Sequence, residues 1–296
     1  MTERSDLQFI DSIIRDSKSI FGAAILITEF SNILIKTSVI SGSFAGVAVF
    51  EIGNSNLTVS NSEFSKNFNI LFLADESELI INNTFISYHT CEVNMQGCIT
   101  FSSRGTKVNI LNLKIMNLSS ENQDNIYLLF AIATIEGLIM KNVSASMQKG
   151  SCLGATGSAI YINQSFFENF FWNCLNIETS TILIENIVLN NSLPDSVKLY
   201  GAFFCKECES YEIRSSLFQK NKNMIKGAAL YLESNIEDQA TFLVENILED
   251  CLFIENHAVE DGGGISSENQ QLIIKNCTFA LNKAERGGGI FNKGKT

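Results

Sequence analysis

The chain has 296 residues, 45% of them hydrophobic and 18% charged, and a formal net charge of −11 at pH 7. This apolar content excludes an intrinsically disordered chain, because burial of so much apolar surface offsets the entropy lost on ordering. The negative charge argues against a nucleic-acid backbone or an anionic membrane surface as the main partner. No apolar run approaches the roughly 18 residues of a membrane span, so the sequence predicts no membrane insertion within this chain.

Both ends of the chain cut into patterned sequence. Residues 1–6 are mostly polar and lead directly into the first apolar run, and a short basic tail, residues 293–295, follows the last one. Since the repeats described below reach both ends, we expect a fragment of a longer repeat protein.

A first motif combines a short β-branched run, an Asn and an aromatic residue close behind it. Weaker copies begin near residues 9, 108, 138, 182 and 212, and the clearest copies occupy residues 57–64, 79–85 and 272–279. The aromatic residue is often followed by Asn three positions later, in the pairs Phe64/Asn67, Phe166/Asn169, Phe218/Asn221, Phe253/Asn256 and Phe279/Asn282.

A second motif follows the first at a short distance and consists of small residues, usually opening with Gly, before an apolar run. Its copies begin at Gly22, Gly46, Gly97, Gly157, Gly201, Gly227, Gly262 and Gly287, with Asn69 and Asn125 in the same position where Gly is missing. Successive copies lie 23 to 44 residues apart, and the order of the two motifs never changes. Such regular self-similarity indicates one repeat architecture throughout the chain.

Both motifs are rich in β-branched and aromatic residues, and the sequence between them lacks sustained helical periodicity. We therefore predict an all-β fold: a right-handed, single-stranded parallel β-helix of about 10–11 coils that forms one domain, residues 1–296. Asn suits a corner in the left-handed region and can bond to the next coil, whereas Gly suits a tight corner with positive φ. A leucine-rich repeat shares the strand-plus-Asn signature, but Ile, Val and Phe occupy positions where that fold needs Leu.

The longest interval between repeats contains an aromatic cluster in residues 163–181. Its members are Phe166, Phe167, Phe170, Phe171 and Trp172, the single tryptophan of the sequence. The interval is either a degenerate coil or an excursion packed on the side of the β-helix. Its aromatic residues are either core residues or a sugar-binding platform.

Eight cysteines lie at positions 91, 98, 152, 174, 205, 208, 251 and 277. Cys205 and Cys208 form a closely spaced pair, but no second Cys/His pair lies near it, as a structural zinc site would require. We therefore expect ordinary buried or partly buried thiols. Cys251 and Cys277 occupy the same place in consecutive coils and are expected to stack as thiols.

The last two repeats carry a family resemblance. Cys251-Leu-Phe253-Ile-Glu-Asn256 precedes a Gly-Gly-Gly-Ile run, and residues 278–290 repeat this pattern. The combination resembles the repeats of the chlamydial polymorphic outer-membrane proteins and, more broadly, the pectin-lyase-like right-handed β-helix superfamily. The resemblance implies a surface-exposed passenger or ectodomain, often adhesive, and an extracellular or cell-surface location as part of a longer chain.

Paired carboxylates are not evident at equivalent positions of neighbouring coils. Glycoside hydrolysis needs two carboxylates on adjacent coils of one face, but Asp250 aligns with Asn276. Glu185 and Glu245 precede other Asn positions in coils that are not adjacent. The remaining acidic pairs are typical of solvated turns, namely Glu207/Glu209, Glu237/Asp238 and Glu260/Asp261.

Cationic and imidazole side chains also lack a catalytic context. The five arginines have no acidic partner in a strand motif, and His89 and His257 are isolated in sequence. We expect these histidines at the surface or at corners rather than in a triad. The sequence therefore predicts no catalytic, cofactor-binding or metal-binding residues.

These observations predict a non-enzymatic β-helical segment with a structural or adhesive role, secreted or at the cell surface. The alternatives are a carbohydrate-active β-helix enzyme, either a polysaccharide lyase or a glycoside hydrolase, and a sugar-binding module. No cofactor is expected. The partner is not identified by the sequence, and a cell-surface protein or a glycan is the candidate.

Overall fold

The computed structural model describes residues 5–20, 23, 25–91, 98–120, 124–145, 150–171, 173–192, 200–234, 246–268 and 271–294. These residues form strands and turns, and none of them belongs to a helix that could cross a bilayer. The chain divides into two compact units, Met1–Gly154 (unit 1) and Ala155–Thr296 (unit 2), which are treated separately below. Several residues singled out in the sequence lie outside the described ranges, namely Gly22, Gly97, Trp172, Glu237, Asp238 and Glu245.

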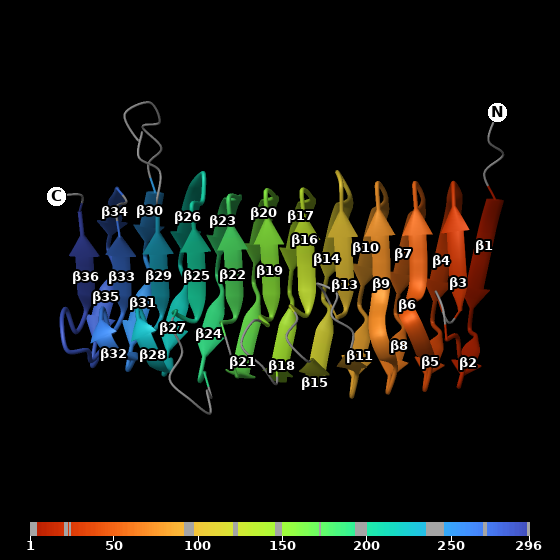
Figure 1. Cartoon of the computed structure of the whole chain (residues 1–296), viewed down its shortest axis with the longest axis horizontal. Helices are drawn as coiled ribbons and strands as arrows, with labels where there is room; N and C mark the ends of the chain where they lie inside the picture. Colours follow the sequence, from red (N-terminus) through yellow and green to blue (C-terminus); the bar gives the residue numbers. More distant parts are fainter. Residues whose placement is uncertain are drawn as a thin grey trace. The chain divides into compact units, whose positions relative to one another are not determined.

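The coils of unit 1 contribute strands to three parallel rows (Figure 1). The first row contains β1 (Ser5–Ile10), β4 (Ser31–Lys36), β7 (Asn56–Ser60), β10 (Glu78–Asn82), β14 (Lys107–Leu111) and β17 (Ile132–Glu136). The second row contains β2 (Ile13–Arg15), β5 (Val39–Ser41), β8 (Glu63–Ser65), β11 (Phe85–Ser87), β15 (Lys114–Ser120) and β18 (Ile139–Ala145). The third row contains β3 (Leu26–Glu29), β6 (Phe44–Gly53), β9 (Phe68–Asp75), β13 (Thr100–Ser103) and β16 (Ile126–Leu129). The short β12 (Thr90–Cys91) pairs with β9 and β15.

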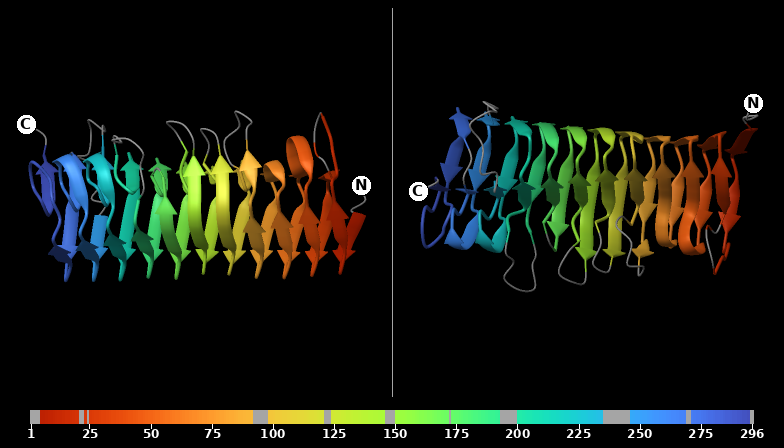
Figure 2. Two further views of the ribbon diagram at one scale, coloured as in Figure 1. Left: turned by 90° about the horizontal axis from the view of Figure 1, so that it is seen from below. Right: turned by 45° about the horizontal axis from the view of Figure 1, so that its top comes forward.

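Unit 2 repeats this arrangement, and Figure 2 shows its coils, in green to blue, from two further sides. Its first row contains β20 (Ala159–Asn163), β23 (Thr181–Glu185), β26 (Ser210–Arg214), β30 (Asn246–Glu249) and β34 (Leu272–Lys275). Its second row contains β21 (Phe166–Phe170), β24 (Val188–Asn190), β27 (Leu217–Gln219), β31 (Leu252–Ile254) and β35 (Thr278–Ala280). Its third row contains β22 (Leu175–Glu178), β25 (Phe203–Lys206), β29 (Leu230–Glu233), β33 (Ile265–Glu268) and β36 (Ile290–Lys293). A corner pair, β28 (Lys222–Lys226) and β32 (His257–Asp261), completes the unit, and β19 (Leu153–Thr156) contains the boundary between the units.

The predicted all-β, right-handed parallel β-helix is confirmed. Strands within each unit pair in parallel and in register, so that Leu79 of β10 faces Leu57 of β7 and Val108 of β14. Among the described residues the first-row strands, one per coil, number six in unit 1 and five in unit 2. The prediction of a single domain stays a prediction.

Residues 163–181, apart from Trp172, contain strands in the order of an ordinary coil. β21 and β22 follow β20 and pair with β24 and β25 of the next coil. Phe167 and Phe170 are at most 1% exposed. These two aromatic residues are therefore core residues and not a platform.

Inward positions of unit 2 repeat the same aromatic side chain from coil to coil. Phe253 stacks between Phe218 and Phe279, with ring centroids 4.9 and 4.7 Å apart and ring planes within 4° of parallel. Phe253 is fully buried. Stacked rings remove large apolar areas from water at one common depth, so the aromatic residue of the first motif builds the core.

Buried asparagines form a second column beside these rings. The backbone N–H of Asn221 donates to Oδ1 of Asn256 (3.1 Å), and the backbone N–H of Asn256 donates to Oδ1 of Asn282 (3.0 Å). The side-chain amide of Asn256 also donates to the carbonyl of Phe218 at 2.9 Å. These bonds satisfy backbone groups where the chain leaves one strand for the next, which explains the Phe-x-x-Asn pattern.

The predicted corners are found at Asn and Gly. Asn186 and Asn276 have φ values of 53° and 50°, and Gly262 has a φ of 63°. A Cβ atom at Gly262 would lie 2.0 Å from the carbonyl oxygen of Ile265. Both the backbone angle and the close approach therefore require glycine at this corner.

Replacing Phe253 by Ala is expected to lower the free energy of unfolding by about 3–5 kcal/mol, because it opens a cavity between two stacked rings. Leu252→Ala is the control, since the neighbouring Leu252 is 41% exposed and its truncation is expected to cost less than about 1 kcal/mol. Urea unfolding followed by circular dichroism measures both variants. Equal losses of unfolding free energy in the two variants would contradict a stabilising role for the stacked phenylalanine rings.

Candidate functional site in unit 2

A row of charged residues ends the third-row strands of unit 2. Strands β25, β29, β33 and β36 lie next to one another (Figure 1). Their last residues are paired in register and are Lys206, Glu233, Glu268 and Lys293. We call these four residues the charged row. Neighbouring parallel strands lie roughly 4.8 Å apart, so Glu233 and Glu268 place two carboxyl groups side by side on one face.

Lys226 joins the charged row from the corner strand β28. Its ammonium group donates a hydrogen bond to Oε1 of Glu268 at 2.5 Å, and its Nζ atom lies 5.7 Å from the centroid of the Tyr231 ring. The hydrogen bond to Glu268 raises the pKa of Lys226, so this side chain is a cation at neutral pH. Glu268, with 15% of its side chain exposed, is thus the carboxylate of a partly buried ion pair.

An aromatic stack lies beside the charged row. Tyr231 is 3% exposed and stacks with Phe204 and Tyr200, whose ring centroids are 5.5 and 5.2 Å away. Burial is the main cause of the raised pKa of the Tyr231 hydroxyl, and the nearby carboxylates of Glu233 and Glu268 raise it further. Tyr231 therefore keeps its proton and is a hydrogen-bond donor next to the two carboxyl groups.

The two carboxyl groups have different surroundings. Burial raises the pKa of Glu233, and the like charge of Glu268 raises it further. The cations of Lys206 and Lys226 act in the opposite direction. Glu233 therefore has a raised pKa, while Glu268 has an ammonium partner. Two carboxyl groups with different surroundings on one face are the arrangement that general acid catalysis with a nucleophile or base requires.

A second ion pair lies at the corner next to Lys226. Asp261 is the register partner of Lys226 and is 2% exposed. Arg286 donates two hydrogen bonds to its oxygens at 2.7 and 2.9 Å, and the guanidinium group lies 5.0 Å from the centroid of the Phe291 ring. The prediction of a solvated turn at Glu260/Asp261 is wrong for Asp261, because the next coil supplies a bidentate cation.

The first row of unit 2 ends in a charged ladder of a different kind. Its members in register are Glu185, Arg214, Glu249 and Lys275. Arg214 lies 3.9 Å from Glu185 and 3.5 Å from Glu249, so the charges alternate in sign. The expectation that no arginine has an acidic partner in a strand motif is therefore wrong. Such exposed pairs contribute little to stability individually.

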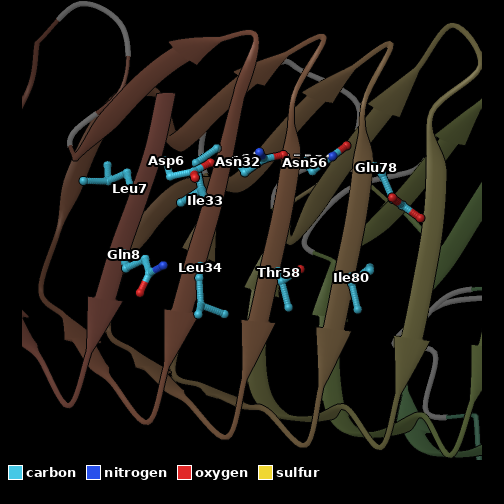
Figure 3. Close-up of a pocket in the computed structure, with 10 residues that line it drawn as sticks. All are labelled: Asp6, Leu7, Gln8, Asn32, Ile33, Leu34, Asn56, Thr58, Glu78 and Ile80. Atoms are coloured by element: carbon cyan, nitrogen blue, oxygen red, sulfur yellow. Dashed lines mark hydrogen bonds between the residues drawn. The ribbon is translucent and has the colours of Figure 1, made fainter. Parts of the chain in front are cut away.

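Unit 1 contains a shallow groove of about 490 Å³ on its first row (Figure 3). One side of its lining is a polar row, in which Nδ2 of Asn32 donates to Oδ1 of Asp6 at 2.9 Å. Asn56 donates to Oδ1 of Asn32 at 3.0 Å, and Glu78 continues the row in register. The other side of the lining is made by Gln8, Leu34, Thr58 and Ile80.

The structure places four of the eight cysteines in two disulfides. Cys91–Cys98 and Cys205–Cys208 are disulfides, with Cα atoms 5.8 and 6.0 Å apart. The prediction of ordinary thiols is wrong for these four residues, because the Cα atoms of each pair lie within bonding reach. No disulfide includes the other four, namely Cys152, Cys174, Cys251 and Cys277.

Cys251 and Cys277 stack as predicted. The backbone N–H of Cys251 lies 3.4 Å from Sγ of Cys277, and both side chains are thiols. His257 is exposed, as expected. His89 is not: it is 1% exposed, and a 2.6 Å hydrogen bond to the carbonyl of Asn69 satisfies one ring nitrogen inside unit 1. His89 is therefore buried rather than at the surface, but it does lie at a corner, between β11 and β12 and next to Tyr88 with a φ of 50°.

The sequence carries a signal for the charged row that the first motif does not show. Glu233 follows Gly227 by six residues, and Glu268 follows Gly262 by the same number. The two carboxyl groups thus pair at the end of the second-motif strand, so the prediction of no acidic pair at equivalent positions of adjacent coils is wrong. The prediction that the chain has no site residues stays a prediction.

No family model matches the sequence, and no curated protein matches it. The A-module of the mannuronan C-5 epimerase AlgE6 of Azotobacter vinelandii aligns over 97% of this chain and 87% of its own, with 7% identity and a TM-score of 0.39. The AlgE4 A-module of the same organism covers 98% and 91%, with 6% identity and a TM-score of 0.37. The catalytic domain of a GH87 α-1,3-glucanase, in complex with tetrasaccharides, covers 96% and 64%, with 11% identity and a TM-score of 0.38.

These comparisons correct the leading functional prediction. A non-enzymatic structural or adhesive segment is contradicted, because the three β-helix structures are carbohydrate-active enzymes by name, and the alternative of a carbohydrate-active β-helix agrees better with them. At such low identity the likeness shows the fold alone, so the function below is argued from this chain's own residues. The parallel β-helix is confirmed by the strand pairing, whereas the pectin-lyase-like superfamily, the chlamydial repeat resemblance and the extracellular location stay predictions.

The pKa of Glu233 is expected to move in opposite directions in two variants. Glu268→Gln removes the like charge and is expected to lower it, whereas Lys206→Met removes a favourable cation and is expected to raise it further. Carboxyl ¹³C chemical shifts of glutamate-labelled protein, followed against pH, measure both changes. Glu249→Gln is the control, because its ladder is on another row. Shifts of the same sign in both variants would contradict this electrostatic account.

Proposed function

We propose that unit 2 carries an acid–base site that cleaves a sugar polymer, with Glu233 as the proton donor and Glu268 as the attacking carboxylate. The observation that carries the proposal is the register pairing of two glutamates, Glu233 and Glu268, at one position of adjacent coils. Glutamates opposite each other destabilise a sheet, and the first-row ladder of the same unit avoids such pairings by alternating its charges. Catalysis gives this unfavourable pairing a reason to be kept.

The spacing supports a retaining mechanism. Adjacent coils lie roughly 4.8 Å apart, and retaining glycosidases hold their two carboxyl groups about 5–5.5 Å apart. Glu233 would protonate the leaving oxygen while Glu268 attacks the anomeric carbon. The resulting carboxylate of Glu233 would then take a proton from the water that hydrolyses the glycosyl intermediate. Lys226 would hold Glu268 in orientation through its hydrogen bond.

The local charge favours an acidic polymer. Lys206 and Lys293 flank the two glutamates in the charged row, although the whole chain has a net charge of −11. Two further cations, Lys226 and Arg286, are paired with Glu268 and Asp261. Cations on the site attract carboxylate-bearing sugars and can pair with them directly. We therefore expect uronic acid polymers as the substrate class.

Uronate polymers incubated with the full chain are expected to gain new reducing ends. Glu233→Gln and Glu268→Gln are each expected to lower kcat at least about 100-fold, since one removes the proton donor and the other the nucleophile. Glu249→Gln, the same change in the alternating ladder, is expected to retain full activity. Reducing-end and ultraviolet assays together distinguish hydrolysis from β-elimination, because only elimination leaves an unsaturated uronate.

Three outcomes would contradict the proposal: no cleavage of any uronate polymer, equal activity in all three variants, or unsaturated products. Unsaturated products would mean that the charged row catalyses β-elimination, as a lyase does, and not hydrolysis.

The groove of unit 1 supports a second candidate function, the binding of a glycan without turnover. Its polar row of amides and carboxylates next to Leu34 and Ile80 presents hydrogen-bonding groups beside apolar surface, as sugar rings require. The amide of Asn56 lies in the middle of this row and is exposed.

Asn56→Leu is expected to weaken glycan binding by the groove about tenfold, the equivalent of about 1.4 kcal/mol, because it removes a central amide. Thr134→Leu is the control, since Thr134 is an exposed first-row residue outside the groove lining. Glycan-array screening followed by calorimetry on the bound glycan measures the effect. Unchanged affinity in Asn56→Leu would exclude the groove as the binding site.

A further inference from the structure

Unit 1 contains a buried group of metal-ligand side chains that the proposed sugar site does not use. Ligand atoms of His89, Cys91 and Cys98 all lie within 4.8 Å of one another. The three residues are at most 1% exposed. Nitrogen and sulfur donors gathered in this way are the ligand set of Zn²⁺ and other thiophilic cations, whereas Ca²⁺ and Mg²⁺ prefer oxygen.

His89 is oriented as a metal ligand would be. Nε2 lies 2.6 Å from the carbonyl oxygen of Asn69, and because a carbonyl only accepts, Nε2 must carry the proton. The other ring nitrogen, Nδ1, is buried without a side-chain hydrogen-bond partner, and the backbone of Cys98 lies beside the ring. A ring N–H bound to a backbone carbonyl is the usual outer support of a metal-binding histidine.

The backbone holds both cysteines near His89 independently of their disulfide. The N–H of Cys98 donates to the carbonyl of Asp124 at 2.8 Å, and the carbonyl of Cys98 accepts from Leu71 at 3.0 Å. Cys91 is the last residue of β12 and pairs with Ser120 of β15. Breaking the disulfide therefore leaves two thiols close to the Nδ1 atom of His89.

We propose that the reduced chain binds one thiophilic divalent cation, of the Zn²⁺ class, through His89 Nδ1 and the thiolates of Cys91 and Cys98. The cation takes the place where the oxidised chain has its disulfide. Two thiolates and one neutral imidazole balance a 2+ charge, so that the buried site is neutral overall. The three ligands leave one tetrahedral position for a further donor.

The two states differ by a balanced exchange of electrons and protons. A dithiol or phosphine reductant supplies two electrons to the S–S bond, and two protons complete the thiols. Cation binding then releases those two protons as the thiolates form. The disulfide form has no thiolate to offer, so oxidation excludes the cation, and the pair acts as a redox-controlled metal site.

The test uses the full chain, reduced with a phosphine, desalted without oxygen and titrated with Zn²⁺ or with Co²⁺ as a spectroscopic probe. We expect one equivalent bound, with a thiolate-to-Co²⁺ charge-transfer band, and no such band in the oxidised chain. Cys98→Ser and His89→Gln are each expected to weaken affinity at least about 10–100-fold, the loss known for outer-shell changes. The matched control is the double variant Cys205→Ser/Cys208→Ser, which removes the other disulfide and is expected to bind as the parent does.

Uptake that survives in Cys98→Ser but disappears in the control variant would move the site to Cys205 and Cys208 and overturn the proposal. No uptake by the reduced parent chain, or equal uptake before and after reduction, would also overturn it. X-ray absorption spectroscopy identifies the Zn²⁺ ligands in the parent chain, so this measurement does not depend on whether any variant folds. Two sulfur ligands and at least one nitrogen ligand are expected, and a shell of oxygen alone or of four sulfurs contradicts the assignment.

Discussion

The backbone hydrogen bonds between successive coils are the constraint on which the other features of each unit depend. Because the strands pair in parallel and in register, any residue meets its equivalent in the next coil at roughly the strand spacing. Phe218, Phe253 and Phe279 therefore stack as parallel rings, and the buried amides beside them bond in sequence. A residue is favourable in such a fold only if it is compatible with a copy of itself or with a complementary neighbour.

This constraint explains why much of the fold could be predicted from the sequence. Where equivalent positions of successive coils accept few side chains, the same residue recurs in the sequence. Examples are the inward Phe and the left-handed corners occupied by Asn186, Asn276 and Gly262. Other corners carry no such signal. Phe130 and Leu281 also have positive φ, at 49° and 57°, although neither residue favours that region. There the pairing of the flanking strands imposes the backbone angle, so the sequence alone could not have identified these corners.

The candidate site was less predictable, because the surroundings of each charged residue depend on residues of the neighbouring coils. Alignment of the second motif could have paired Glu233 with Glu268. It could not have shown that Lys226 reaches Glu268 from a corner strand, since the register shifts between β28 and β32. His89 was misjudged for a related reason. A lone histidine is usually exposed, and the burial of His89 follows from contacts with Asn69 and Cys98, neither of which is adjacent to it in the sequence.

The two charged ladders of unit 2 differ in the order of positive and negative side chains along neighbouring strands. Around Arg214 the signs alternate, so each charge has an opposite neighbour on the adjacent strand. On the third row Glu178 faces Lys206 and Lys206 faces Glu233, but the alternation then fails where Glu233 meets Glu268. Stability alone would favour a cation or an amide at one of these positions. Proteins keep such locally unfavourable groups where activity needs them, and a shared face between an acid and a carboxylate is what bond cleavage in a sugar polymer requires.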